Sequence, residues 1–349
     1  REAKASMSIF DPASLLSRLN RNETDSVDRH IAFNLRLADS IGALSGGRYD
    51  VTVKPLVEAW GFAGKAAQAH PNVDSILDFV GREKVRIERG RLVKSDPRVQ
   101  LDFNSVAKGY TVDLLAELVE RFGAENYIVD IGGEIRCRGV NRTGEAWRIG
   151  VETPFDGNMS DGEYLQKRIR LREGGLATSG NYRRFYLDAD GRKVAHTIDP
   201  RTGRSALSRL LSVTVVAPTC AEADALGTMF LAMGADDALA AAERMRAAFD
   251  ARRRLAMALL DEIPALRYVR PQGAFYILID VRGTGMDGGQ FARRALEEAH
   301  VALVPAASFG GDCAGFVRMS YAAGEVEIRA GLARLKDWLD AKRRDSHVG

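Results

Sequence analysis

The spacing of apolar and polar residues predicts helices at the start of the chain and several short strands after them. Residues 27–47 place apolar side chains at helical spacing and end at Gly46-Gly47, a common way for a helix to stop. Strand-like runs follow at 84–95, 98–104, 125–133, 134–140, 145–154, 164–171 and 210–218, with helices expected at 108–122 and 220–233. Strands that mostly neighbour one another favour an α+β fold with a largely antiparallel sheet, and not a doubly wound dinucleotide-binding fold.

The pattern changes near residue 244. A long basic amphipathic helix is expected over 244–266, followed by an apolar strand within 268–281, a helix at 289–299, apolar segments at 301–310 and 315–322, and a last helix from 324 to about 343. This is a unit of about 100 residues, a size that can fold alone. We therefore predict two domains, 1–244 and 245–349.

Composition and charge exclude several classes of protein. The chain of 349 residues is 46% hydrophobic and 28% charged and has no long apolar run, which argues against disorder and against a membrane span. The formal charge of +3 is too small to indicate a nucleic-acid partner. Cys137, Cys220 and Cys313 are far apart, so neither a zinc site nor a disulfide framework is expected. The chain starts without Met and without a leader-like pattern, so the compartment is not predicted.

Two helical runs carry candidate chemistry for an anion and a metal ion. Lys108 lies in the first turn of a helix that directly follows a strand-like run, where unpaired N–H groups and the helix dipole favour an anion. Asp224 and Thr228 are four residues apart and share one helical face. A carboxylate and a hydroxyl are ligands that suit Mg²⁺. The alternatives are a solvated lysine, and a helix cap beside a buried threonine.

Two further runs point to a bound ligand and a base. Thr178, Ser179 and Gly180 follow an apolar run and could bend the backbone against a ligand. His196 precedes a turn that contains Pro200. A histidine at this place is either structural or able to take a proton from an incoming hydroxyl.

These runs together resemble one known family. "VAKGYTVD", "ATSGNYRR", "HTIDPRTG" and "APTCAEADALGT", with residues 45–62 and 127–139, are similar to the ApbE family, the FAD:protein FMN transferases, over about residues 5–243. The resemblance implies an enzyme that binds FAD with Mg²⁺, passes the FMN half to a Thr or Ser hydroxyl of an acceptor protein, and releases AMP. An FAD-binding protein without transfer activity is the alternative.

The resemblance also implies roles for particular residues. Asp224 and Thr228 would bind the metal with their side chains, and Ala107 would bind it with its main-chain carbonyl. Lys108 would lie near the phosphates, and His196 would be the base. The flavin-nucleotide pocket would include Asn20, Asp50, Thr52, Thr178, Ser179 and Gly180.

Partners and boundaries follow from the same resemblance. Acceptors of the family are typically subunits of membrane redox pumps such as the sodium-translocating NADH:quinone reductase, and its bacterial members are commonly periplasmic or lipid-anchored. Members usually begin with a further strand and end with closing strands, and this chain carries neither. We therefore expect exposed sheet edge in the first domain.

The last hundred residues resemble a different family. Over about residues 245–340 the chain is similar to the small C-terminal domain of class I aminotransferases, which use pyridoxal phosphate (PLP). Arg318 matches the arginine that binds the substrate carboxylate there. Residues 1–244 contain no run like the family's Schiff-base lysine, so PLP catalysis is not expected and Arg318 is predicted to be idle. Two families joined inside a helix indicate a spliced or engineered fusion.

Overall fold

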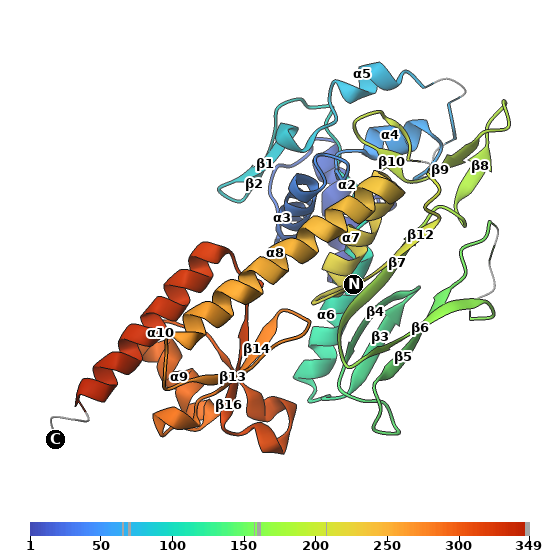
Figure 1. Ribbon diagram of the computed structural model, residues 1–349. Coiled ribbons are helices and arrows are strands. Elements are labelled where there is room, and N and C mark those ends of the chain that lie inside the picture. The colour runs from blue at the N-terminus through green and yellow to red at the C-terminus, as the bar shows by residue number, and fades with distance from the viewer. Residues whose placement is uncertain (65, 69–70, 157, 159–161, 207, 346–349) are drawn as a thin grey trace. The chain divides into compact units, whose positions relative to one another are not determined.

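The computed structural model describes residues 1–64, 66–68, 71–156, 158, 162–206 and 208–345 (Figure 1). The chain divides into two compact units, Arg1–Leu239 and Ala240–Gly349. Helix α8 (Ala235–Asp261) runs through this division and also through the predicted boundary at residue 244, which remains a prediction. No helix among the described residues has both the length and the apolar character that crossing a membrane requires.

An antiparallel sheet of four strands forms the centre of the first unit. Its strand order is β12 (Ser212–Ala217), β7 (Glu173–Gly180), β4 (Glu134–Arg138) and β3 (Tyr127–Ile131). Helices α6 (Ala107–Arg121) and α7 (Cys220–Met233) pack against this sheet and against each other (Figure 1). The predicted α+β fold with a largely antiparallel sheet is confirmed.

Shorter elements surround this sheet. The helices are α1 (Glu2–Met7), α2 (Leu15–Asn20), α3 (Arg29–Leu44), α4 (Lys54–Ala59), α5 (Val73–Leu77) and the 3₁₀ helix η1 (Arg82–Lys84). The strands are β1 (Val85–Glu88), β2 (Arg91–Lys94), β5 (Trp147–Glu152), β6 (Leu165–Leu171), β8 (Phe185–Leu187), β9 (Lys193–Ala195), β10 (Ile198–Asp199) and β11 (Arg204–Ser205). They pair as two-stranded antiparallel ribbons: β1 with β2, β5 with β6, β8 with β9, and β10 with β11.

One strand prediction in the first unit was wrong, and one strand was left out of the predicted list. Residues 98–104 form no strand and contribute one isolated bridge, between Gln100 and Val53. Side chains satisfy this backbone instead, because the Asn20 amide donates to the Leu101 carbonyl and accepts from the Leu101 N–H. The central strand β7 was missed, since two glycines interrupt its apolar pattern. Residues 178–180 belong to this strand and do not follow it.

The second unit contains its own antiparallel sheet and core. The strand order is β13 (Arg267–Val269), β14 (Tyr276–Asp280), β16 (Phe316–Ser320) and β15 (Val304–Pro305). The core joins the sheet to α8, α9 (Gly288–Ala299) and α10 (Glu325–Asp345) through buried residues that include Leu260, Ile277, Phe291, Val317 and Leu335. The 3₁₀ helices are η2 (Arg282–Thr284), η3 (Ala306–Phe309) and η4 (Gly311–Cys313). The apolar segment expected at 301–310 therefore contains both the short strand β15 and the 3₁₀ helix η3.

Candidate active site

The start of helix α7 is held by three side chains. Thr219 and Glu222 form a capping box, in which each side chain accepts a hydrogen bond from the other residue's backbone N–H. Asp113 of α6 accepts from the N–H groups of Cys220 at 2.9 Å and Ala221 at 2.8 Å. These bonds satisfy N–H groups that a helix start leaves unpaired, and they place a carboxylate at the positive end of the helix dipole. Helix α6 therefore fixes the position of α7.

Glycine makes this close approach of the two helices possible. A methyl group at Gly109 would overlap the carbonyl oxygen of Cys220 and lie 2.9 Å from the Asp224 Cβ. The backbone N–H of Gly109 also donates to Asp224 Oδ2 at 2.9 Å. Gly109 therefore brings the first turn of α6 directly against the carboxylate of α7.

We predict that Gly109→Ala separates the two helices. Overpacking of a close contact costs about 1–3 kcal/mol, so the melting temperature should fall. Circular dichroism on heating measures this change. Gly331→Ala is a matched control within a helix, because a methyl group at this residue of α10 meets no atom within 4 Å. Equal melting temperatures for Gly109→Ala and the wild type would contradict the packing argument.

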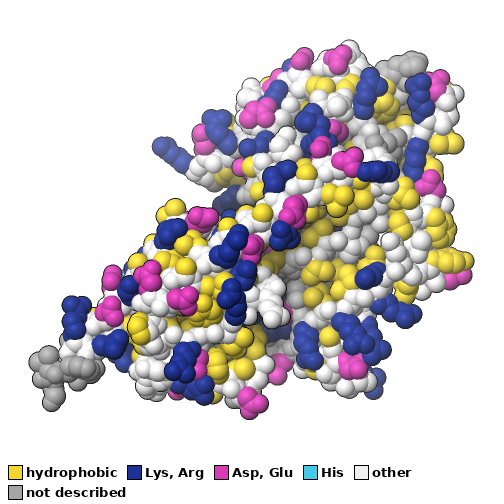
Figure 2. Space-filling view, in the orientation of Figure 1, with side chains coloured by type: hydrophobic (Ala, Val, Ile, Leu, Met, Phe, Trp, Pro, Cys, Tyr) yellow, Lys and Arg dark blue, Asp and Glu magenta, His cyan; other side chains and the backbone are white. Residues whose placement is uncertain are grey.

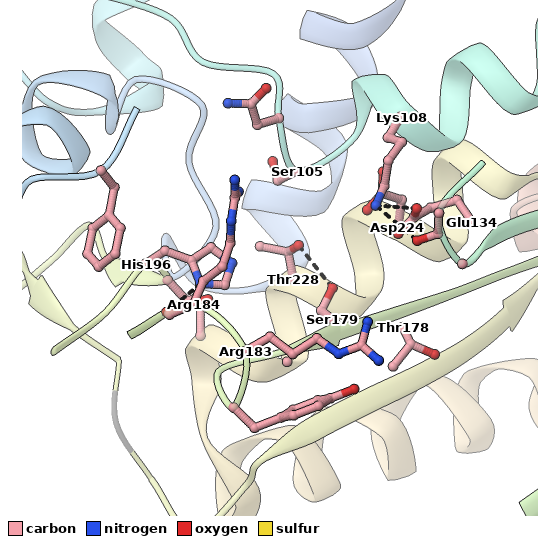
Figure 3. A pocket seen from close by; sticks show the side chains of 18 of the residues that line it. Ser105, Lys108, Glu134, Thr178, Ser179, Arg183, Arg184, His196, Asp224 and Thr228 are labelled. Carbon is pink, nitrogen blue, oxygen red and sulfur yellow. Dashed lines mark hydrogen bonds and ion pairs between the residues drawn. The ribbon is translucent and has the colours of Figure 1, made fainter. Parts of the chain in front are cut away.

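A cleft of about 1450 Å³ opens in the first unit, beside α6, α7 and the end of β7 (Figure 3). Pockets for drug-sized ligands usually measure about 300–1,000 Å³, so this cleft has room for a dinucleotide. Many of the residues expected from the sequence line it: Asp50, Lys108, Thr178, Ser179, Gly180, His196, Asp224 and Thr228. The fold therefore brings together side chains that lie up to 178 residues apart in the sequence, from Asp50 to Thr228 (228 − 50).

One end of the cleft is acidic. Figure 3 shows Lys108, Glu134 and Asp224 together, and Lys108 forms an ion pair with Glu134. Burial raises the pKa of Asp224 to about 6, although the Gly109 N–H and Lys108 oppose this shift. Burial also raises the pKa of Glu134 to about 7, where Lys108 lowers it and Asp224 raises it further. One half-exposed lysine thus faces two buried carboxyl groups, an arrangement that favours another cation.

Hydroxyl groups line the cleft next to this acidic end. Thr228 Oγ1 and Ser179 Oγ are 3.2 Å apart, and Thr178 Oγ1 and Thr214 Oγ1 are 2.9 Å apart. The first pair joins α7 to β7, and the second joins β7 to β12. Both pairs fix the hydroxyl groups in place, so their oxygens are positioned before a ligand binds.

His196 stands at the other end of the view in Figure 3, next to Arg184. Its Nδ1 lies 3.3 Å from the Arg184 carbonyl oxygen, and its ring meets the Phe62 ring edge-on with centroids 6.2 Å apart. Burial lowers the pKa of His196. The imidazole is therefore neutral at pH 7, the state in which it can accept a proton.

Three residues assigned by resemblance lie outside the cleft lining of the described residues. Asn20 uses its amide on Leu101, as described above. Thr52 is fully buried and supports Asp50: its N–H and hydroxyl both donate to Asp50 Oδ1, and its oxygen accepts from the Gly81 N–H. The Ala107 carbonyl accepts the hydroxyl of Thr111 at 2.7 Å. Their roles toward a nucleotide or metal remain predictions.

Sequence reasoning missed several residues of this cleft. Glu134 lies immediately after two glycines with positive φ, a turn that returns the chain from β3 to β4. That turn was the available signal, because binding and catalytic residues are found disproportionately on loops that a rigid scaffold positions. Arg183, Arg184 and Phe62 also line the cleft, and the pattern alone does not tell them from surface residues.

The raised pKa of Asp224 predicts a stability effect that depends on pH. The folded-state pKa of about 6 exceeds the ordinary value of 3.8, so stability is lost as pH rises from about 4 to 6. Asp224→Asn keeps an acceptor for the Gly109 N–H and should be more stable than the wild type at pH 8, by on the order of 1–3 kcal/mol. At pH 4 the two proteins should melt alike without metal. A difference that stays constant between pH 4 and pH 8 would contradict this origin.

Comparison with known proteins identifies the family. Residues 1–252 match the family model described as the ApbE family. This chain belongs to the ApbE family. It is 38% identical over 257 residues to the FAD:protein FMN transferase of Haemophilus influenzae, covering 70% of this chain and 73% of the relative. It is 33% identical over 243 residues to that of Escherichia coli K12, covering 66% and 68%.

Solved structures of the ApbE family agree with this assignment. The flavin transferase ApbE from Vibrio cholerae has a TM-score of 0.62 and 36% identity, covering 70% of this chain and 78% of that one. A flavinyl transferase ApbE from Pseudomonas stutzeri, in apo form, has a TM-score of 0.62 and 29% identity, covering 70% and 75%. The sequence resemblance to ApbE is therefore confirmed.

The C-terminal part matches a second family model. The family model described as aminotransferase class I and II matches residues 207–335, which agrees with the resemblance in that part of the sequence. Arg318 lies on β16, with its guanidinium carbon 4.2 Å from the Tyr276 ring centroid and 4.3 Å from that of Phe309. These rings hold its guanidinium by cation–π contacts. That Arg318 binds no substrate in this chain remains a prediction.

Proposed function

We propose that this protein transfers FMN from FAD to a Thr or Ser hydroxyl of an acceptor protein and releases AMP. Family membership and relatives named FAD:protein FMN transferase support transfer of FMN from FAD to a protein. The observation that carries the proposal is the juxtaposition in one cleft of Asp224, Thr228 and Lys108 at one end and His196 at the other. The first three groups suit the diphosphate of a dinucleotide, and the histidine suits the proton of an incoming hydroxyl.

The donor set at the acidic end fits Mg²⁺. Asp224 offers a carboxylate, Thr228 a hydroxyl and Ala107 a carbonyl, all hard oxygen donors of the kind that Mg²⁺ binds together with water and phosphate. Within the described residues no cluster of three His, Cys, Asp or Glu side chains could hold a metal. When bound, Mg²⁺ would neutralise charge on the diphosphate.

The remaining residues bind and orient the substrates. Lys108, held by Glu134, places a positive charge beside the phosphates. The fixed hydroxyls of Thr178 and Ser179 lie along the wall and can donate to the nucleotide. Phe62 offers an aromatic face beside His196. Together these groups hold the diphosphate in line with an incoming hydroxyl.

His196 takes the proton in the transfer step. The acceptor hydroxyl oxygen forms a bond to the phosphorus of the FMN half, and its proton passes to the neutral imidazole. The bond between that phosphorus and the bridging oxygen breaks, and the electron pair leaves with AMP. Atoms and charge balance without an oxidant or reductant.

Release of AMP tests the proposal. The chain is incubated with FAD, Mg²⁺ and a purified flavin-acceptor domain of a redox-pump subunit, and nucleotides are separated by chromatography. We expect AMP to appear in proportion to acceptor, and only when both Mg²⁺ and acceptor are present. FAD that stays bound and intact under these conditions would identify a flavin-binding protein without transfer activity.

A further inference from the structure

The ribbon of β5 and β6 has two chemically different faces. Its register sets Ile149 opposite Ile169 and Trp147 opposite Leu171, and residues directly opposite each other share a face. Ile149, Ile169 and Leu171 pack with Leu176 of the central sheet. This apolar face is therefore covered within the first unit.

The opposite face of the ribbon is basic. The register sets Arg148 opposite Arg170 and Gly150 opposite Arg168, so three exposed arginines share this face. Figure 2 shows Lys and Arg side chains gathered over the part of the molecule where β5 and β6 lie. Arg148 pairs with Glu145, whereas no described carboxylate forms an ion pair with Arg168 or Arg170.

Stability of the ribbon does not explain this arrangement. Like charges directly opposite each other on a two-stranded ribbon are destabilising, and here Arg148 faces Arg170. Surface charges at the edge of a binding site instead raise the rate at which a partner of opposite charge associates. The basic face therefore has the character of a docking surface for an anionic partner.

This basic face is continuous with the cleft. Arg148, Gly150 and Leu165 line the cleft, and a methyl group at Gly150 would lie 2.7 Å from Leu165 Cδ2. Glycine thus leaves room for the Leu165 side chain at the cleft wall. Arg168 and Arg170 are outside the cleft lining, so they are placed to meet a macromolecule at the rim and not the nucleotide within.

We propose that the basic face of the β5–β6 ribbon, formed by Arg148, Arg168 and Arg170, docks an acidic segment of the acceptor protein. The inference rests on the proposed function, because the acceptor hydroxyl must enter the cleft that this ribbon borders. Charge complementarity favours a protein segment rich in Asp and Glu next to the modified residue. The ribbon then orients the acceptor as well as attracting it.

Charge reversal on strand β6 tests this docking. Arg168→Glu and Arg170→Glu are compared with the control Lys167→Glu. Lys167 lies on the same strand but is opposite Val151, on the face of the ribbon that does not carry the three arginines. The probes are a purified flavin-acceptor domain with an acidic flank, and the same domain with its flanking Asp and Glu changed to Asn and Gln. We expect each arginine variant to raise the KM and the Kd for the acidic domain about three- to tenfold. The kcat and the KM for FAD should stay within about twofold.

The acceptor domain with its flanking Asp and Glu changed to Asn and Gln separates charge-dependent docking from other effects of the arginine variants. It should bind the wild type more weakly and should lose most of its sensitivity to the arginine variants. The inference is overturned if Arg168→Glu and Arg170→Glu bind the acidic domain as Lys167→Glu does. It is also overturned if these variants lose only binding to vesicles of phosphatidylserine and phosphatidylcholine, because the partner would then be a lipid surface. Since Kd is measured without turnover, a wild type that binds but does not transfer would refute the proposed function alone.

Discussion

Asp224→Ala is expected to lower the rate of FMN transfer by at least about a thousandfold. The change removes the carboxylate that faces the cleft beside Lys108, and with it the donor that carries most of the charge in the proposed Mg²⁺ site. The cation that Asp224 would hold neutralises charge developing at the phosphate, and loss of one such stabilising group costs about 10²–10³ in rate by itself. Loss of the orienting role that the proposed metal would have adds to this cost. Stopped reactions with FAD and an acceptor domain measure the rate.

Two further variants make this result specific to the site. Asp236→Ala removes an exposed carboxylate that pairs with Arg209 at the start of α8, and it should transfer FMN like the wild type. Asp224→Asn keeps the shape and the hydrogen bond with Gly109 but lacks the charge, so its activity should be as low as that of Asp224→Ala. Activity of Asp224→Asn near the wild-type rate would exclude Asp224 as a charged ligand.

His196→Ala is expected to slow transfer to the acceptor by about 10²–10⁴, the usual contribution of a general base. Affinity for FAD should change much less, because the variant leaves Lys108, Asp224 and Thr228 in place. Single-turnover mixing of the FAD-loaded protein with acceptor separates the two effects. A large loss of FAD affinity with an unchanged transfer rate would show that His196 binds the nucleotide and is not the base.

The pH profile of the wild type provides an independent check on His196. Because burial lowers the pKa of His196, the imidazole stays neutral to a lower pH than an exposed histidine. The rate should therefore fall only when pH drops below the ordinary histidine pKa of about 6.5. In His196→Ala the part of this limb due to the imidazole should disappear, which leaves the fall near pH 6 that protonation of Asp224 causes. A limb with the same midpoint and depth in the variant as in the wild type would show that His196 does not contribute to it.

The strongest parts of the site could be predicted from the sequence because they depend on local geometry. Asp224 and Thr228 are one helical turn apart, so any helix over these residues puts both side chains on one face, and the structure places both in the cleft. Lys108 follows the same logic at a helix start. These predictions needed only the identity of the element and no long-range contact.

The missed parts depend on contacts between distant segments. Glu134 acquires its importance from the ion pair with Lys108 and from burial beside Asp224, and no local pattern contains either contact. Strand β7 was missed because glycines interrupt it, and one of them is required by the close approach of α7: a methyl group at Gly175 would overlap the backbone of Cys220. Tertiary packing selects glycine there and so erases the apolar pattern of a strand.

The central claim is that this cleft moves FMN from FAD onto a protein hydroxyl. The most direct test is the intact mass of a flavin-acceptor domain after incubation with the chain, FAD and Mg²⁺. The account predicts that the domain gains the mass of one FMN less one water, and that this gain is absent with Asp224→Ala. An acceptor that keeps its original mass with the wild-type chain, while a related FMN transferase modifies it under the same conditions, would contradict the claim.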